Sequence, residues 1–166
     1  MIKNLFKVED NIKITGTWID GVKIVKLRRF NDERGEILHM LKSTDEIFTK
    51  FGEIYFSCGY PNVVKAWHIH KDMTLNNCCV VGMVKLVIHD LRKESISFGS
   101  TMEIFIGEKN YCLVQIPPHV ANGYKAFGEK MAIMANCASI PHDKNELVYI
   151  DPFNNSIPYK WDLIHG

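Results

Sequence analysis

The chain has 166 residues, which is the length of one domain of ordinary size. Its composition, 46% hydrophobic and 23% charged, is typical of a globular protein and excludes a disordered, collagen-like or purely coiled-coil chain. With 20 Lys and Arg against 19 Asp and Glu, the formal net charge of +1 gives no sign of a nucleic-acid partner or an anionic membrane. The sequence has no apolar run long enough to cross a membrane and no signal-peptide pattern, so we expect no membrane partner.

Short segments rich in β-branched and aromatic residues dominate the chain and predict strands. One short helix is expected at Thr44–Phe51, where Thr44 can cap the first turn and acidic residues follow it. Gly82 lies inside the longest strand-like segment and predicts a bulge or bend there. In chain order the predicted strands are Val22–Leu27, Glu53–Ser57, Val63–Trp67, Cys78–Asp90, Glu103–Ile106, Cys112–Ile116 and Met131–Asn136.

Many short strands with turns between them predict a β-sandwich or a β-barrel. No repeat, low-complexity tract or linker interrupts the chain, so we expect a single domain over residues 1–166. The segment Asp151–Leu163 is punctuated by Pro and Asn and is expected to pack irregularly over the barrel.

The cysteines are odd in number and form no C-x-x-C pair. Such a set predicts free thiols in a reducing compartment, and we therefore expect a cytoplasmic protein. The five residues are Cys58, Cys78, Cys79, Cys112 and Cys137.

The segment from Lys65 to Lys71, KAWHIHK, holds the densest group of residues that can do chemistry. On a strand with a period of two, His68 and His70 share one face, and Lys65 shares the other face with Trp67. The two imidazoles would be about 7 Å apart along the strand and could both enter a barrel mouth. Histidine can move protons near neutral pH or bind a metal, so both uses stay open, unless a bulge near Trp67 turns one ring away.

Five segments spread over residues 22–161 resemble the motifs of one family, the dTDP-4-dehydrorhamnose 3,5-epimerases, which are cupin barrels. This resemblance implies an all-β cupin fold, a double-stranded β-helix or jelly-roll barrel with few short helices. It divides the domain into N-terminal edge strands at about 1–30, a barrel at about 31–140 and an irregular segment at 141–166. It also implies a homodimer. The matching segments are Phe30–Gly35 (FNDERG), Val64–His68 (VKAWH), Asp90–Gly99 (DLRKESISFG), Ile116–Tyr124 (IPPHVANGY) and Asp151–Trp161, with its DP and IPYKW pieces.

The family removes a proton next to the C4 ketone of a nucleotide-linked 4-keto-6-deoxy sugar and returns a proton to the opposite face, without a metal or cofactor. Such chemistry needs a base, an acid and a group that stabilises an enolate. The family's base lies in its V-x-R-G-x-H motif, and the resemblance assigns that role to His68. It also implies a dTDP-linked sugar as the substrate and surface-polysaccharide biosynthesis as the setting.

Several helpers of the family's base are replaced in this sequence. The resemblance puts Lys65 in place of an Arg, Asn122 in place of a His, and no Tyr on the strand Met131–Asn136, where the family carries its acid. The family's Asp that orients the base follows the I-x-W motif, so no counterpart is expected before Gly166. We expect His70 and Lys71 to compensate for these losses, with His70 as a second catalytic residue.

A metal site is one alternative for the two histidines. In metal-binding cupins a Glu follows H-x-H, and here that position falls on Thr74 or Leu75. The later His of that motif falls on Asn122, and His119 could serve only through an unusual turn. Because catalytic metal sites need about three protein ligands, we expect no metal.

Three other functions remain as alternatives to epimerisation. The H-x-H-K pattern resembles the related cupin 3,4-ketoisomerases, which move a proton between adjacent carbons. The missing acid and the Asn122 replacement are compatible with a cupin that binds a nucleotide sugar without converting it. The third alternative is a metal-dependent cupin enzyme that uses His68 and His70.

Residues expected to hold the substrate surround these histidines. The resemblance gives Arg34 and Lys65 to the pyrophosphate, although Arg34 could equally be a turn residue paired with Asp32. Lys71, Asn122 and Tyr124 complete the expected binding set. The charged run Arg92–Glu94 is interpreted as a solvated turn.

Overall fold

The computed structural model describes residues 12–162, which form thirteen strands and no helix. All strand pairs are antiparallel. The strands are β1 (Ile14–Gly16), β2 (Lys23–Lys26), β3 (Arg29–Asp32), β4 (Gly35–Leu38), β5 (Glu53–Gly59), β6 (Val64–His70), β7 (Leu75–Val81), β8 (Met83–Asp90), β9 (Thr101–Gly107), β10 (Cys112–Ile116), β11 (Val120–Phe127), β12 (Ala132–Ala138) and β13 (Leu147–Tyr149).

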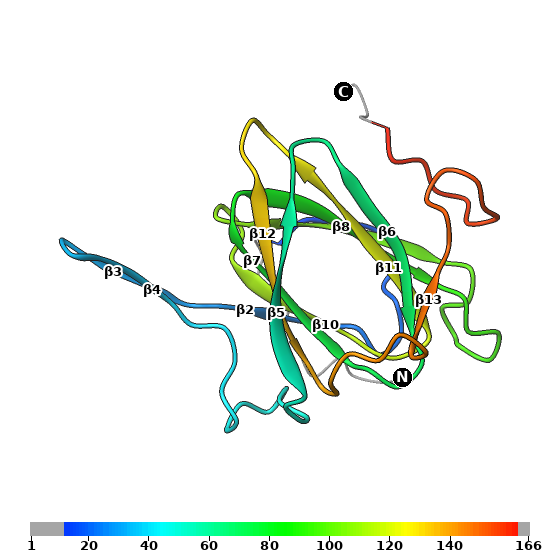
Figure 1. The fold of residues 1–166 in the computed structure, drawn as a ribbon, viewed down its shortest axis with the longest axis horizontal. Helices are drawn as coiled ribbons and strands as arrows, with labels where there is room; N and C mark the ends of the chain where they lie inside the picture. The colour runs from blue at the N-terminus through cyan, green and yellow to red at the C-terminus, as the bar shows by residue number, and fades with distance from the viewer. Residues whose placement is uncertain (1–11, 163–166) are drawn as a thin grey trace.

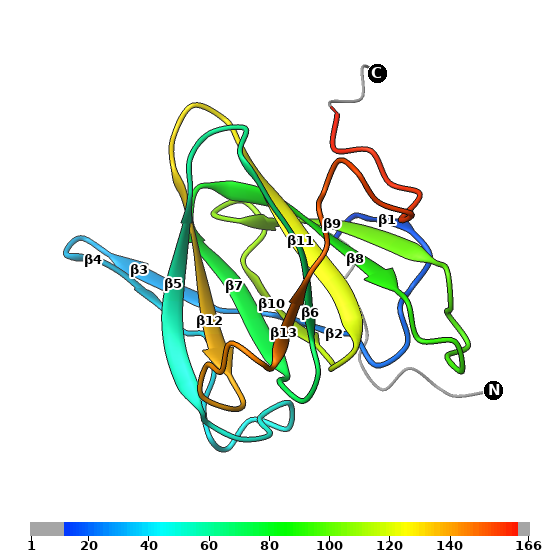
Figure 2. The ribbon, with the colours of Figure 1, turned by 45° about the vertical axis from the view of Figure 1, so that its right-hand side comes forward.

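Two sheets face each other and form the barrel (Figures 1 and 2). The six-stranded sheet has the order β1-β9-β8-β11-β6-β13, and the five-stranded sheet has the order β2-β10-β7-β12-β5. This arrangement confirms the predicted all-β cupin jelly roll. The few short helices expected with it are absent from residues 12–162, and no helix there could therefore span a membrane.

The main hydrophobic core lies between the sheets. It contains alternate residues of the central strands, such as Leu86 and Ile88 of β8 and Val114 and Ile116 of β10. Inward-facing residues at every second position are what a strand with one face on the core requires. This core occupies part of the barrel and leaves room for a cavity beside it.

A second apolar cluster covers the outer face of the six-stranded sheet. Trp67 of β6 and Val87 of β8 are fully buried there beneath Ile157 and Trp161 of the C-terminal segment. The rings of Trp67 and Trp161 lie 5.0 Å apart. This packing confirms the prediction that the tail lies over the barrel, and it explains why β8 is buried on both faces.

Two local predictions have different outcomes. The predicted bend at Gly82 is confirmed, because Gly82 has a φ of 71° and separates β7 from β8. The predicted helix at Thr44–Phe51 is wrong. Asp45 accepts the backbone N–H of Lys42 through its side chain, and successive tight turns follow up to Phe48. Asp competes with helical hydrogen bonds in this way, and two turns of helix are too short to outweigh it.

The ends of the domain also differ from the expected boundaries. β1 is part of the six-stranded sheet and β2 is part of the five-stranded sheet, whereas the β3–β4 hairpin projects away from the barrel (Figure 1). The C-terminal region, expected to be irregular, contributes β13 to the six-stranded sheet. Residues 1–11 of the expected N-terminal edge and residues 163–166 lie outside the described residues.

Candidate active site

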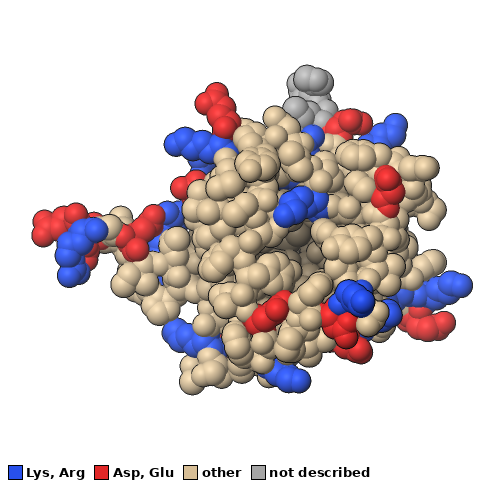
Figure 3. All heavy atoms as spheres, in the orientation of Figure 1, with Lys and Arg blue, Asp and Glu red and all other residues tan. Residues whose placement is uncertain are grey.

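A cavity of about 460 Å³ opens between the two sheets. Its apolar part is formed by Met73, Leu75, Leu86, Met134 and Leu147, and the rest of its lining is polar or aromatic. Figure 3 shows the hollow near the middle of this face, surrounded mostly by uncharged atoms. The polar and aromatic residues of the lining are Glu53, Tyr55, Ser57, Lys65, His68, His70, Asn77, Asn122, Tyr124, Asn136, His142 and Tyr149.

Strand β6 supplies the chemical centre of the cavity. His68 and His70 both line it, as the period of two predicts. Lys65 also lines it, so the prediction that Lys65 shares a face with Trp67 is wrong. The cause is an irregular register against β11, where Asn122 pairs with His68 but Tyr124 pairs with Lys65. The extra residue between these pairs returns Lys65 to the inner face.

The backbone of His68 is fixed by a hydrogen bond from Asn122, whereas its ring nitrogens have no hydrogen-bond partner among the described residues. Asn122 of β11 donates from Nδ2 to the His68 carbonyl oxygen at 3.1 Å, and the Tyr149 ring contacts the imidazole edge-on at 5.1 Å. Among the described residues, no side chain forms a hydrogen bond with either ring nitrogen of His68. Burial lowers the pKa of His68 to about 4, and the positive charges of His70 and Lys65 add to this effect. The ring is therefore a neutral base at physiological pH.

His70 is in a different environment from His68. Its Nδ1 lies 2.5 Å from Oε2 of Glu146, and both side chains are more than nine-tenths buried. The other oxygen of Glu146 accepts the backbone N–H groups of Asp72 and Met73 at 3.0 and 2.9 Å. Burial opposes the charge of Glu146, but these three hydrogen bonds together lower its pKa. The carboxylate is therefore ionised beside His70.

A chain of three polar groups crosses another part of the cavity. Lys65 donates from Nζ to Oγ of Ser57 at 2.6 Å, and Ser57 Oγ is 2.8 Å from the Tyr124 hydroxyl. Burial raises the pKa of Tyr124, although the hydrogen bond with Ser57 partly offsets this effect. Lys65 is the one Lys or Arg side chain among the described residues that line the cavity.

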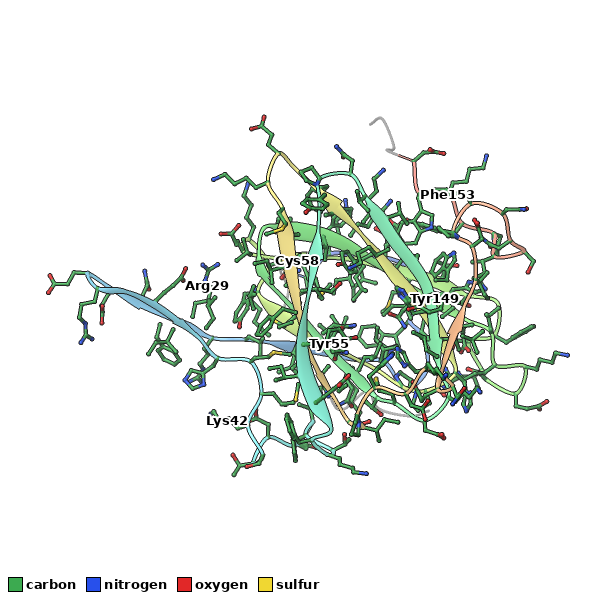
Figure 4. All side chains as sticks on the ribbon, in the orientation of Figure 1. Arg29, Lys42, Tyr55, Cys58, Tyr149 and Phe153 are labelled. Carbon is green, nitrogen blue, oxygen red and sulfur yellow. The ribbon has the colours of Figure 1, made fainter. Side chains whose placement is uncertain are left out.

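A second phenol faces the cavity from β5. Asn136 of β12 donates from Nδ2 to the Tyr55 hydroxyl at 2.9 Å, and the two residues are register partners. Burial raises the pKa of Tyr55. β12, the strand without a Tyr, thus presents an amide that holds a phenol of the neighbouring strand. In Figure 4, Tyr55 and Tyr149 lie on separate strands on either side of this face.

Two predicted binding residues are not brought into the cavity. Arg34 lies at the turn of the β3–β4 hairpin, 84% exposed, and its Nη2 bonds Oδ2 of Asp32 at 2.6 Å. Lys71 is exposed and donates to the carbonyl oxygen of Asn145 at 2.6 Å. The other predicted residues, Lys65, His68, His70, Asn122 and Tyr124, all line the cavity together.

The sequence interpretation missed three residues of this site. Glu146 is 76 positions from His70, and no motif or spacing links them. Tyr149 lies on β13, which pairs with β6 so that Tyr149 is opposite His68. The short run of apolar and aromatic residues from Leu147 to Tyr149 was the one available signal for that strand. Asn136 lay on a predicted strand, but its contact depends on how β5 and β12 pair.

The described residues contain no group of three His, Cys, Asp or Glu side chains that could hold a metal ion. His119, considered as a third ligand, is exposed in a turn with a φ of 63° and is not part of the cavity lining. All five cysteines are free, as predicted.

A jelly-roll barrel with two histidines in a polar cavity defines a cupin-type enzyme site. Over residues 16–165 the chain matches the family described as dTDP-4-dehydrorhamnose 3,5-epimerase. The chain therefore belongs to that family and is a carbohydrate epimerase, an isomerase of nucleotide-sugar and polysaccharide biosynthesis.

Three relatives illustrate this membership. A dTDP sugar isomerase from Desulfovibrio desulfuricans has a similar structure, with a TM-score of 0.84 and 38% identity, over 86% of this chain and 92% of that one. The spore coat polysaccharide biosynthesis protein SpsL of Bacillus subtilis is 36% identical over 111 residues, which are 67% of this chain and 74% of SpsL. The probable low-salt glycan biosynthesis epimerase Agl13 of Haloferax volcanii is 30% identical over 143 residues, which are 85% of this chain and 88% of Agl13.

Proposed function

We propose that this protein epimerises a nucleotide-linked 4-keto-6-deoxy sugar, most simply a dTDP-linked one, with His68 as the base and without a metal. The observation that carries the proposal is the state of His68: a neutral, half-buried imidazole with free ring nitrogens in the cavity. A group of this kind can accept a proton from carbon when the proton is acidified by a neighbouring ketone. The family membership of the chain supports the choice of substrate class.

The proposed reaction has two proton transfers. His68 takes the proton from the carbon next to the C4 ketone, and the C–H electron pair moves to the carbonyl oxygen to give an enolate. A donor on the other side of the sugar then returns a proton to that carbon, which inverts it and restores the ketone. Lys65 is the cation available to bind the pyrophosphate or to stabilise the enolate charge, and Tyr124 and Asn122 line the same space.

One observation favours a second candidate, the 3,4-ketoisomerase reaction. Both histidines of the H-x-H pair line one cavity from one strand. Two bases on one side of a sugar suit the removal of a proton from C3 and its delivery to C4, by which the ketone moves from C4 to C3. This reaction and epimerisation share the first step at His68 and differ in the product.

The test is mass-monitored exchange in deuterium oxide with dTDP-4-keto-6-deoxyglucose. We expect one deuteron for epimerisation at one carbon and two for epimerisation at both C3 and C5, with nuclear magnetic resonance identifying the inverted centre. A 3-keto product would identify the isomerase. Binding without exchange would instead support a non-catalytic nucleotide-sugar-binding protein, and activity that requires added metal would contradict the metal-free proposal.

We also propose that the protein is a cytoplasmic homodimer. The projecting hairpin exposes Phe30 and Ile37, and β5 is a sheet edge that exposes Ile54 and Phe56. Exposed apolar edges of this kind need a cover, and a second copy of the chain provides one. A dimer would also give Arg34 a substrate to contact, since the hairpin carries it away from its own cavity (Figure 1).

The mass in solution tests the dimer directly. Light scattering coupled to size exclusion is expected to give twice the chain mass of 19.1 kDa. Replacing Phe30 and Ile37 by Ser should shift the population toward monomer, since it removes apolar surface from the hairpin. The matched replacement of exposed Phe153 in the C-terminal segment should leave the mass unchanged. A monomeric wild-type protein would contradict the proposal.

A further inference from the structure

We propose that Tyr55 is the proton donor of the epimerisation, and that it acts across the cavity from His68 on the carbon that His68 has deprotonated. This inference rests on the proposed function and assigns its second proton transfer to a catalytic residue. Inversion requires a donor of this kind, because a proton taken from one face of the sugar must be replaced from the other. The donor must therefore come from the side of the cavity opposite His68.

The two sheets form the two sides of the cavity. His68 belongs to β6 of the six-stranded sheet, and His70 lies on the same strand. Tyr124 of β11 and Tyr149 of β13 belong to this sheet as well, since both strands pair with β6. Tyr55 comes from β5, at the edge of the five-stranded sheet. Among the described residues, it is the one phenol that lines the cavity from the sheet opposite His68.

Few other groups on that sheet have a proton to give. Besides Tyr55, the five-stranded sheet lines the cavity with one carboxyl group and one hydroxyl group among the described residues, those of Glu53 and Ser57. Ser57 Oγ is engaged by Lys65 at 2.6 Å. A carboxyl group is ordinarily ionised at neutral pH, whereas a phenol keeps its proton. Burial raises the pKa of Tyr55 further, and this effect outweighs the opposing hydrogen bond from Asn136.

A chain of buried amides determines where the Tyr55 hydroxyl can send its proton. Asn136 is 1% exposed, and its Oδ1 accepts the backbone N–H of Asn76 at 2.9 Å, which leaves Nδ2 to donate to the Tyr55 oxygen. The side chain of Asn76 is fixed in turn, since it accepts from Gln115 and donates to the Cys137 carbonyl oxygen. Toward the protein, the Tyr55 oxygen is therefore an acceptor. Its own proton has no acceptor in the described part of the chain and is available to a substrate.

The same hydrogen bond suits the proposed transfer. After His68 has taken its proton, the enolate electron pair forms a new C–H bond with the Tyr55 proton, and the C4 ketone is restored. The electrons of the broken O–H bond stay on the phenolate oxygen, where the N–H of Asn136 stabilises the new charge. Tyr55 is 40% exposed, so the phenolate can recover a proton from water. His68 returns its proton to water, and the cycle closes without another reactant.

The test separates proton removal from inversion in deuterium oxide. Tyr55→Phe keeps the aromatic ring and removes the hydroxyl. With His68 intact, the variant should still remove the proton, exchange it with solvent and return a deuteron to the same face of the sugar. We expect epimer formation to slow by about 10²-fold or more, the usual contribution of a general acid, while total deuterium entry into substrate and product stays within about threefold. Mass spectrometry measures the label, and nuclear magnetic resonance measures the epimer.

Three further variants serve as controls. Tyr60→Phe removes an exposed phenol that is not part of the cavity lining, and it should alter neither rate. Glu53→Gln and His142→Asn remove the titratable groups that line the cavity from β5 and from the segment after β12. Neither should lower inversion more than it lowers exchange. Thermal unfolding checks that each variant is folded.

The outcomes distinguish the inference from the proposed function. Lost inversion with retained exchange in folded Tyr55→Phe would support the inference. Normal inversion in that variant, or equal losses of exchange and inversion, would overturn it, and a selective loss in Glu53→Gln or His142→Asn would then identify the donor. A wild-type protein that exchanges no proton would instead overturn the proposed function itself. Wild-type exchange that yields a 3-keto product and no epimer would overturn both epimerisation and the role of Tyr55.

Discussion

Replacing His68 by Asn is expected to slow deuterium entry into the substrate by about 10²- to 10⁴-fold, which is the usual contribution of a general base. Asn has no nitrogen that can accept a proton, and the other histidine that β6 places in the cavity is engaged by Glu146. Asn also fits the space and leaves the backbone contact from Asn122 in place, because that bond is made to the carbonyl oxygen of residue 68. The measurement is the initial rate of mass increase at fixed substrate concentration.

His119→Asn is the matched control for this loss. His119 is exposed and has a φ of 63°, a conformation that Asn adopts readily, so the substitution changes a histidine without strain. Its exchange rate should equal that of the wild-type protein. Normal exchange in His68→Asn would contradict the role of His68, whereas a loss in both variants would point to damage elsewhere.

The pH dependence follows from the same ring. An ordinary histidine is half protonated near pH 6.5, but the pKa of His68 is about 4 in the folded protein. Only the neutral ring accepts a proton, so the exchange rate should be flat from neutral pH down to about pH 5 and should fall below it. A fall centred near pH 6.5 would mean that the cavity does not desolvate His68.

The main features of the fold could be predicted from local sequence patterns, because they depend on residues near one another in the chain. The segments that became β5, β8, β10 and β12 carried alternation or β-branched residues, and Gly82 marked the turn between β7 and β8. β11 was not predicted as a strand, because Pro117 and Pro118 lie just before it and polar residues interrupt its sequence, VANGYKAF. Its burial between β6 and β8 comes from tertiary pairing, which a local pattern does not contain.

The part of the site that depends on strand periodicity was also predictable, and the part that depends on strand pairing was not. His68 and His70 share a face because of strand periodicity, so their meeting in the cavity needed no tertiary information. Lys65 was given the wrong face, because one irregular pair of registers between β6 and β11 reverses the alternation. Glu146 could not be predicted at all, since its contact with His70 depends on the pairing of β13 with β6.

The Asp90–Ser97 turn illustrates a structural role that composition concealed. The run Arg92–Glu94 was interpreted as a solvated turn, and Lys93 and Glu94 are indeed exposed. Arg92, however, is bound to the fully buried Asp90, with Nε at 2.8 Å from Oδ1 and Nη2 at 2.8 Å from Oδ2. One residue of the charge cluster thus forms an ion pair with a fully buried carboxylate outside it, which charge patterning alone does not reveal.

Replacing Asp90 by Ala is expected to lower the free energy of unfolding by about 3 kcal/mol or more, the usual cost of removing one partner of a buried pair. The carboxylate accepts hydrogen bonds from the hydroxyls of Ser95 and Ser97 at 2.5 and 2.6 Å, besides those from Arg92. Its removal leaves the buried hydroxyl of Ser97 and the Arg92 guanidinium without their acceptor. Urea unfolding at one protein concentration measures the difference.

The hairpin supplies a control with the same local geometry. Asp32 and Arg34 repeat the D-x-R spacing, and Arg34 bonds Asp32 through its backbone N–H, Nε and Nη2 as Arg92 bonds Asp90. That pair is exposed to solvent, so Asp32→Ala should leave the unfolding midpoint unchanged. Equal losses in the two variants would show that the turn itself, and not burial of the carboxylate, stabilises the protein.

The pH dependence of the Asp90 effect gives a further check on its cause. Although burial raises it, the pKa of Asp90 is held well below the usual range by the hydrogen bonds from Arg92, Ser95 and Ser97. A carboxyl whose pKa is lower in the folded protein than in the unfolded chain contributes its full stabilisation at pH values above the unfolded-state pKa. It loses that contribution as the pH falls from the unfolded-state pKa toward the folded-state pKa. The difference between wild type and Asp90→Ala should therefore stay constant from pH 7 to about pH 5. A difference that shrinks over this interval would mean that Asp90 is not ionised in the folded protein.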